Sequence, residues 1–137
     1  MEELEKLRKE IDKLDKMIAE LISKRQGLSN KILEAKGGKF TYDPVRERKV
    51  MEKIFSYDID SKLAERIWRQ IIAFNLSKQK KLKIGYLGDD KFSIAAYESY
   101  FGPYFENRDF KNVNELMKGI NNKTIDALIT VSYTHLR

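Results

Sequence analysis

The sequence predicts an all-α domain of three helices, followed by an incomplete α/β segment. The first observation is an alternating spacing of three and four residues between apolar positions from Leu4 to Ala35, typical of a helix that buries one face. The second is a pair of capping signals, at Asp43 and at Asp60 or Ser61, that begin two further helices. The third is a change at Lys81 to alternating strand and helix patterns, which is typical of a parallel sheet.

The composition restricts the kind of protein that this chain can be. With 42% hydrophobic and 35% charged residues over 137 positions, it has enough apolar residues for a core. It lacks a run of about 18 apolar residues and an apolar leader, so we expect a cytoplasmic protein that does not enter a membrane. There is no cysteine, and His135 is the only histidine. Metal binding and catalysis by histidine or thiolate are therefore disfavoured.

The net charge of +6 lies mainly in the first part of the chain. Residues 1–80 carry 19 lysines and arginines against 14 acidic residues, whereas residues 81–137 carry 8 against 7. This excess suits an anionic partner, either a small molecule or a nucleic acid. Lysine and glutamate are intermixed, and no basic run carries interleaved aromatic residues, which argues against a nucleic-acid surface.

The first expected helix runs without proline from Glu2 to Lys36. At about 1.5 Å per residue it is roughly 50 Å long, which is too long for a compact fold of residues 1–80 to cover. Three helices of which one is far longer than the others indicate an intertwined homodimer, in which the long helices of two chains pack together.

Two shorter helices follow the long one. Asp43 caps the second helix, and Pro44 fits its first position. The polar stretch 56–60 separates it from a third helix, which ends near Lys80. The three helices together form a predicted domain of residues 1–80.

The pattern after the third helix is that of a parallel α/β segment, residues 81–137. Lys83–Leu87 and Ile125–Val131 are expected strands, with helical patterns at 92–100 and 112–120 between them. The run has the order β-α-β-α-β, but this length is too short to complete such a sheet with both faces covered. We therefore expect this segment to be incomplete.

Arg25 stands where a leucine or isoleucine is expected, between Leu21 and Leu28 on the apolar face of the long helix. An arginine does not lose its proton, and burying it without a partner is costly. A buried Arg25 therefore needs a buried anion, either a carboxylate side chain or a ligand that carries its own negative charge. An Arg25 that extends out of the apolar face to solvent, or pairs with a glutamate, is the commoner alternative.

Arg8 and Lys36 lie on one edge of the same helix, about 42 Å apart. They cannot contact one small ligand from a single chain. In an antiparallel pair of helices related by a two-fold axis, Arg8 of one chain approaches the Arg25–Lys36 region of the other. Two equivalent sites then follow from the symmetry of the pair.

The second and third helices carry further polar residues that suit a ligand site. Each also has an ordinary explanation: Asp43 as a cap, Arg46 with Glu47 as an exposed ion pair, and Asn75 and Gln79 as solvated helix residues. Asn75 and Gln79 are four residues apart, so they lie on one face of their helix. None of these residues identifies a site when taken singly.

Taken as an ordered set, the polar residues and their flanking segments resemble a known family. Residues 4–80 resemble the all-helical chorismate mutase family, in order and spacing, through the segments LRKEIDKLDKMIAELISKR, KILEAK, YDPVRE and IIAFNLSKQ. That family rearranges chorismate to prephenate, in phenylalanine and tyrosine biosynthesis, in intertwined dimers without a cofactor or a covalent intermediate. The resemblance therefore implies a homodimer that binds a small dicarboxylate.

The resemblance also implies roles for the basic residues. Arg25, together with Arg8 from the partner chain, would bind the two carboxylates of the substrate, with Arg46 in support. Lys36 and Gln79 would hydrogen-bond the ether oxygen of the bond that breaks.

The remaining residues would hold the ring hydroxyl of the substrate. The resemblance assigns this role to Glu47 with the Asp43 region, while Asn75 stands where many relatives have serine and can also donate a hydrogen bond. A pericyclic rearrangement transfers no proton and needs no nucleophile, so a site without cysteine or histidine is adequate.

Residues 82–131 resemble the start of a prephenate dehydratase, which follows the mutase in bifunctional enzymes of phenylalanine biosynthesis. The usual glycine- and proline-bearing loop after the first strand is replaced by Gly88-Asp89-Asp90-Lys91, and the later strands and the threonine-bearing catalytic segment are absent. We therefore expect no dehydratase activity from this chain. The sequence of residues 132–137 departs from the Asn/Ser-containing turn with which relatives would continue, and we interpret these residues as a tail that is not native coding sequence.

Two other functions compete with a chorismate mutase. One is a non-catalytic helical dimer that serves as a regulatory or interaction module, and the other is a basic coiled coil that binds nucleic acid. A scaffold alone would not need Arg25 on its apolar face, and nucleic-acid binding would weaken steeply with salt. The sequence thus favours the mutase.

Overall fold

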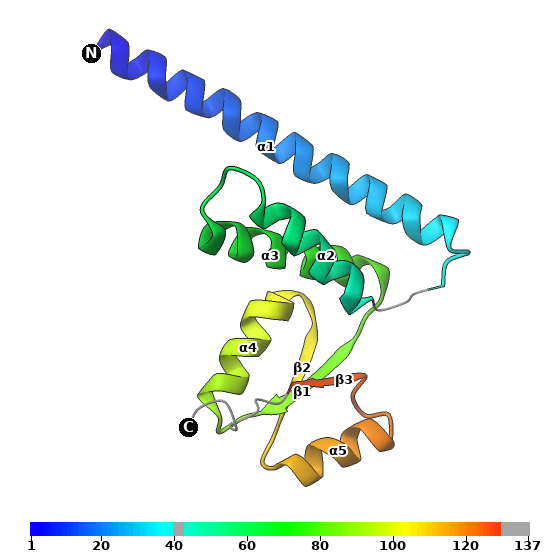
Figure 1. Ribbon diagram of the computed structural model, residues 1–137. Coiled ribbons are helices and arrows are strands. Elements are labelled where there is room, and N and C mark those ends of the chain that lie inside the picture. Colours follow the sequence, from blue (N-terminus) through cyan, green and yellow to red (C-terminus); the bar gives the residue numbers. More distant parts are fainter. Residues whose placement is uncertain (40–42, 130–137) are drawn as a thin grey trace. The chain divides into compact units, whose positions relative to one another are not determined.

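The computed structural model describes residues 1–39 and 43–129 of the chain (Figure 1). The chain divides into two compact units, Met1–Thr41 and Tyr42–Arg137. The first unit contains one long helix, and the second contains two helices followed by a three-stranded parallel sheet with its own helices. The predicted fold class, an all-α part followed by a small, incomplete α/β segment, is confirmed.

Helix α1 comprises Glu2–Ala35 and ends one residue before its predicted end. It ends because Gly37 and Gly38 adopt positive φ angles of 72° and 73°, which residues with a side chain rarely adopt. The Gly38 N–H then donates a hydrogen bond to the Leu33 carbonyl oxygen at 3.0 Å, satisfying one of the last carbonyl groups of the helix.

The apolar face of α1 is exposed. No residue of this helix, all of which the structure describes, is buried. The leucines and isoleucines of that face are each between 47% and 61% exposed: Leu4, Leu7, Ile11, Leu14, Ile18, Leu21, Leu28 and Ile32. An amphipathic helix in water gains most of its stability by burying such a face, so α1 needs a further surface to cover it.

Helices α2 (Pro44–Phe55) and α3 (Ser61–Gln79) pack against each other and are joined by a short connection. Each begins where predicted, because an aspartate side chain caps its first turn. Asp43 accepts a hydrogen bond from a backbone N–H of α2 at 2.9 Å, and Asp60 accepts one from α3 at 3.0 Å. The buried residues of the two helices are Met51, Ile54, Ala64, Ala73 and Asn75.

The sheet contains three parallel strands in the order β2-β1-β3. The strands are β1 (Lys83–Leu87), β2 (Glu106–Phe110) and β3 (Ala127–Ile129); the helices between them are α4 (Lys91–Phe101), η1 (Gly102–Tyr104) and α5 (Val113–Asn121). The predicted order β-α-β-α-β is confirmed. Thr130 and Val131, assigned to the last strand from the sequence, lie outside the described residues.

Gly85 in the middle of β1 allows α5 to approach the sheet closely. A Cβ atom at this position would lie 2.9 Å from Leu116 Cδ1 and 3.0 Å from Phe110 Cε2, closer than carbon atoms approach. Ile84 and Leu116 are fully buried. The core of the α/β segment therefore depends on a glycine in the strand and a leucine in the helix.

Helix α3 packs on the α/β segment as well as on α2. The rings of Phe74 and Tyr104 meet edge to face with their centroids 5.5 Å apart, and the Arg69 guanidinium carbon lies 4.5 Å from the centroid of the Tyr100 ring.

The boundary between predicted domains 1–80 and 81–137 falls inside the second unit and stays a prediction. The predicted tail, residues 132–137, lies outside the described residues.

We expect Leu116→Ala to lower the free energy of unfolding by about 2–5 kcal/mol, because it leaves a cavity against Gly85 and Ile125 in a fully buried place. The control is Met117→Ala at the next position of α5, where the side chain is 46% exposed and the change should stay within about 0.5 kcal/mol. Urea unfolding of the full chain measures both. Equal losses in the two variants would contradict the described packing.

Candidate functional site

Three predicted site residues, Arg8, Arg25 and Lys36, belong to α1 or its C-terminal cap. Arg8 is exposed, and its Nη1 lies 3.1 Å from Glu5 Oε1 in an ion pair that contributes little to stability. Lys36 is the C-cap, where the helix dipole favours a positive charge. The rise of the helix separates Arg8 from Lys36 by about 42 Å, so one chain does not bring them together.

Arg25 differs from the apolar residues on either side of it. Leu21 and Leu28 are 61% and 52% exposed, whereas Arg25 is less exposed than either of them. A guanidinium is the costliest group to remove from water on this face, so its partial burial is consistent with an anion-binding role. The alternative, an Arg25 that extends toward solvent or pairs with a glutamate, stays open.

The first turn of α2 contains three predicted site residues. Asp43 Oδ1 accepts a hydrogen bond from the Arg46 backbone N–H at 2.9 Å, and the Arg46 side chain is exposed. Glu47 is half-buried, and no ion pair joins it to Arg46 among the residues that the structure describes. The ordinary explanation of Arg46 and Glu47 as an exposed ion pair is therefore wrong.

The environment of Glu47 changes its acidity. Burial raises the pKa of the Glu47 carboxyl above its ordinary value. The positive charge of Arg69 on α3 opposes this rise in the pKa, and the negative charge of Asp43 adds to it. The environment of Glu47 thus disfavours its ionised form, and the charge of Arg69 offsets part of that effect.

The end of α3 contains the last two predicted site residues. Asn75 is buried, with 7% of its surface exposed, and Gln79 is half-buried at the final position of the helix. Because the connection 56–60 between α2 and α3 is short, the two helices form a hairpin, and the end of α3 lies toward the beginning of α2. Asn75 and Gln79 thus lie near the end of α3, whereas Asp43 and Glu47 lie at the beginning of α2.

Arg69 is a residue of this region that the sequence pattern did not identify. Its positive charge lowers the pKa of Glu47, and its guanidinium contacts the ring of Tyr100. Nothing in the spacing of charges along α3 distinguishes it, since Lys62, Arg66 and Lys78 are also cationic. The signal that could have identified Arg69 is a cation near a half-buried Glu47.

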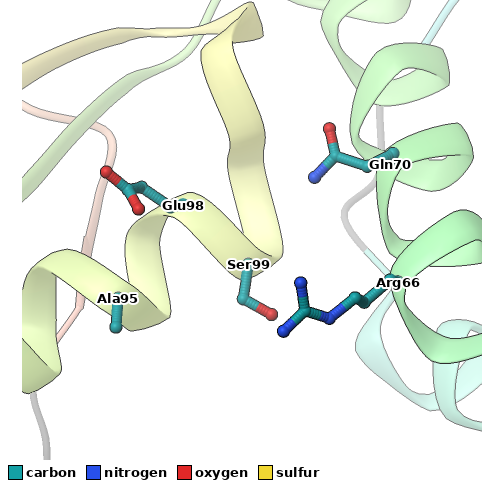
Figure 2. A pocket seen from close by; sticks show the side chains of 5 residues that line it. All are labelled: Arg66, Gln70, Ala95, Glu98 and Ser99. Carbon is teal, nitrogen blue, oxygen red and sulfur yellow. The ribbon is translucent and has the colours of Figure 1, made fainter. Parts of the chain in front are cut away.

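A cavity of about 450 Å³ lies between α3 and α4, away from the predicted site residues (Figure 2). Its lining contains Arg66, Gln70, Ala95, Glu98 and Ser99. Figure 2 shows the Arg66 guanidinium directed toward the Ser99 hydroxyl across the gap between the helices. None of the residues predicted from the sequence lines this cavity, so it is not the predicted site.

Two further properties of the described ranges bear on the kind of site. Among their residues, no group of three or more histidine, aspartate or glutamate side chains is placed to hold a metal ion. None of their helices has the length and apolar character needed to cross a membrane.

The chain belongs to the chorismate mutase type II family. The model of that family matches residues 7–80, which is more than half of the chain. This range contains α2, α3 and nearly all of α1, and it includes every site residue predicted from the sequence. The resemblance of the helical part to chorismate mutases is therefore confirmed.

Three bacterial relatives are similar to this chain, and each is named a bifunctional chorismate mutase/prephenate dehydratase. The Aquifex aeolicus protein is 36% identical over 112 residues, which cover 74% of this chain and 31% of the relative. The Stutzerimonas stutzeri protein is 27% identical over 130 residues, covering 87% and 36%. The Pseudomonas aeruginosa protein is 30% identical over 112 residues, covering 74% and 31%.

The chain spans about a third of the length of these relatives. The resemblance of residues 82–131 to the start of a dehydratase stays a prediction, because the family match ends at residue 80. No solved structure matches the chain.

We expect Asp43→Ala to lower the free energy of unfolding by about 1 kcal/mol, because the N–H of Arg46 loses its hydrogen-bond acceptor. Asp43→Asn should keep the native stability, since asparagine caps a helix as well as aspartate does. Thermal unfolding compares the two variants. A native stability for Asp43→Ala would show that the cap contributes nothing, and a loss in Asp43→Asn would show that the negative charge matters to folding.

Proposed function

We propose that this chain is a chorismate mutase that rearranges chorismate to prephenate. The observation that carries this proposal is the family match to residues 7–80, a range that also contains all the residues which the resemblance assigns to the site. The names of the three relatives support the same activity. Dehydratase activity is not proposed for this chain, and its cytoplasmic location stays a prediction.

The substrate determines what the site must supply. Chorismate carries two carboxylates and must adopt a compact conformation before its bonds can rearrange. Holding a flexible reactant in its reactive geometry can lower the barrier by several kcal/mol. Negative charge also grows on the ether oxygen as its bond to carbon breaks, and fixed hydrogen-bond donors stabilise that charge. Arginine is well suited to the carboxylates, because its planar guanidinium binds a carboxylate through two parallel hydrogen bonds.

The site needs a second copy of the chain. The exposed apolar face of α1 supports this, because an antiparallel pairing of two α1 helices would cover the face in both copies. In such a pair, Arg8 of one protomer reaches the Arg25–Lys36 region of the other, which it cannot reach within its own helix. We therefore propose an intertwined homodimer in which each site takes Arg8 from the partner protomer.

The remaining residues complete the proposed site. Arg25 and the partner's Arg8 bind the two carboxylates, with Arg46 in support. Lys36 and Gln79 donate hydrogen bonds to the ether oxygen.

The ring hydroxyl of the substrate lies on the acidic side of the site. Glu47, in its ionised form, accepts a hydrogen bond from this hydroxyl, with Asp43 beside it. Asn75 donates a further hydrogen bond from its buried position on α3.

Lys36→Ala tests the proposed role of Lys36 as a hydrogen-bond donor to the ether oxygen. Removing a donor that acts only in the transition state should lower kcat by about 100-fold to 1,000-fold, or roughly 3–4 kcal/mol, with a smaller effect on KM. The control is Lys39→Ala, an exposed lysine to which no role is assigned. Loss of chorismate absorbance measures both variants. An unchanged kcat with a higher KM would contradict the catalytic role, and an inactive native chain would favour the non-catalytic helical dimer.

Mixing two inactive variants tests the supply of Arg8 by the partner. Arg8→Ala and Arg25→Ala homodimers should each be nearly inactive. When their chains are exchanged, half of the dimers contain both variants, and each of these dimers has one site with both arginines intact. We therefore expect about a quarter of the native activity to return in an equal mixture. No recovery after verified chain exchange would show that Arg8 and Arg25 act within the same chain.

A further inference from the structure

The second half of α3 is held from the side by η1. Both elements belong to the second unit, and η1 packs against α3. A Cβ atom added at Gly102 would lie 2.8 Å from Gln70 Oε1, so the backbone of η1 comes close to α3 at that point. One turn further along α3, the ring of Phe74 meets the ring of Tyr104 edge to face, with 5.5 Å between their centroids. Residues four apart lie on the same face of a helix, so the two contacts form one strip along α3.

The chain directly after α3 is held as well. Helix α3 ends at Gln79, Lys80 is already extended, and β1 begins at Lys83. Leu82, between the two elements, is buried, and the Lys83 N–H donates a hydrogen bond to Asp126 Oδ2 at 2.8 Å. Strand β1 is the middle strand of the sheet and pairs with both β2 and β3. The first residues after α3 are therefore fixed by the core of the α/β segment.

Gln79 lies between these two attachments. It is five residues after Phe74, which contacts η1, and three residues before the buried Leu82. The last turn of a helix has carbonyl groups without partners in the helix, and such ends open more easily than the middle. Contacts on both sides of the last turn oppose this opening. The packing of the α/β segment on α3 therefore restricts where the half-buried Gln79 can lie.

We propose that Tyr104 is a positioning residue for the mutase site, which holds the last turn of α3 through its ring contact with Phe74 and thereby keeps Gln79 in place. This inference rests on the proposed function, in which Gln79 donates a hydrogen bond to the ether oxygen. Tyr104 lies in η1, after residue 80, where the match to the family model ends. The segment after α3 thus contributes to the mutase site through its packing on that helix.

Amide hydrogen exchange of the full chain tests this packing without relying on activity. Tyr104→Ala removes the ring contact, so the amides of residues 77–80 should exchange about 2-fold to 10-fold faster, while those of α5 keep their native rates. Tyr104→Phe keeps the ring and should exchange like the native chain. The control is Tyr57→Ala, in the connection between α2 and α3, where the side chain is 59% exposed and the exchange at residues 77–80 should not change.

The kinetics of chorismate rearrangement provide a second readout. Because Gln79 is proposed to stabilise charge that grows in the transition state, its displacement should lower kcat with little change in KM. We expect Tyr104→Ala to lower kcat about 3-fold to 10-fold and Tyr104→Phe to keep the native kcat. In a Gln79→Ala background, Tyr104→Ala should have no further effect, because residues that act through one interaction are not additive. A merely structural role for Tyr104 would lower kcat by the same factor in both backgrounds.

The outcomes separate this inference from the proposed function. Native exchange at residues 77–80 in Tyr104→Ala, or additive losses of kcat with Gln79→Ala, would overturn the role of Tyr104. If Tyr104→Ala fails to fold, Tyr104→Leu, which keeps an apolar side chain without the aromatic ring, decides the matter in the same way. A native chain without mutase activity would refute the proposed function, while hydrogen exchange would still show whether Tyr104 holds the end of α3.

Discussion

The exposed apolar face of α1 is the constraint on which the rest of the molecule depends. Burial of a leucine or isoleucine side chain is worth roughly 1.5–3 kcal/mol, and α1 leaves a row of them about half exposed. A helix of 34 residues with such a face is stable in water when another surface covers it. A second copy of α1 is the surface that the proposed function requires. In the proposed homodimer, the same pairing would bring Arg8 of one protomer within reach of Arg25 of the other.

Two charges of the proposed site are stabilised from different sources. Arg25 stands in a row of apolar residues, where a guanidinium needs an anion, and the substrate would supply that anion as a carboxylate. Burial raises the pKa of the Glu47 carboxyl, and the positive charge of Arg69 opposes that rise. The first charge would thus depend on the substrate and on the covering of α1, and the second on burial within the second unit.

The sequence predicted the features that local chemistry determines. The capping signals at Asp43 and Asp60 placed the beginnings of α2 and α3. The anion expected at the misplaced Arg25 stays a prediction. A strand was expected between the two helices, but the sequence did not show which residues form it. The residues of β2, Glu106–Phe110, are largely polar and exposed, so they lack the apolar pattern of a strand. The burial of Asn75 and the position of Arg69 depend on neighbours distant in the chain, which no spacing pattern reveals. The supply of Arg8 by a partner remains a prediction from the length of α1.

The most direct measurement is the sedimentation of the catalytically active species, followed by the loss of chorismate absorbance in the moving band. It reports the size of the molecules that turn over substrate, whatever else the sample contains. We predict that the activity sediments with the mass of two chains. Full activity sedimenting with the mass of one chain would contradict the two-chain site, because a single α1 cannot bring Arg8 to Arg25.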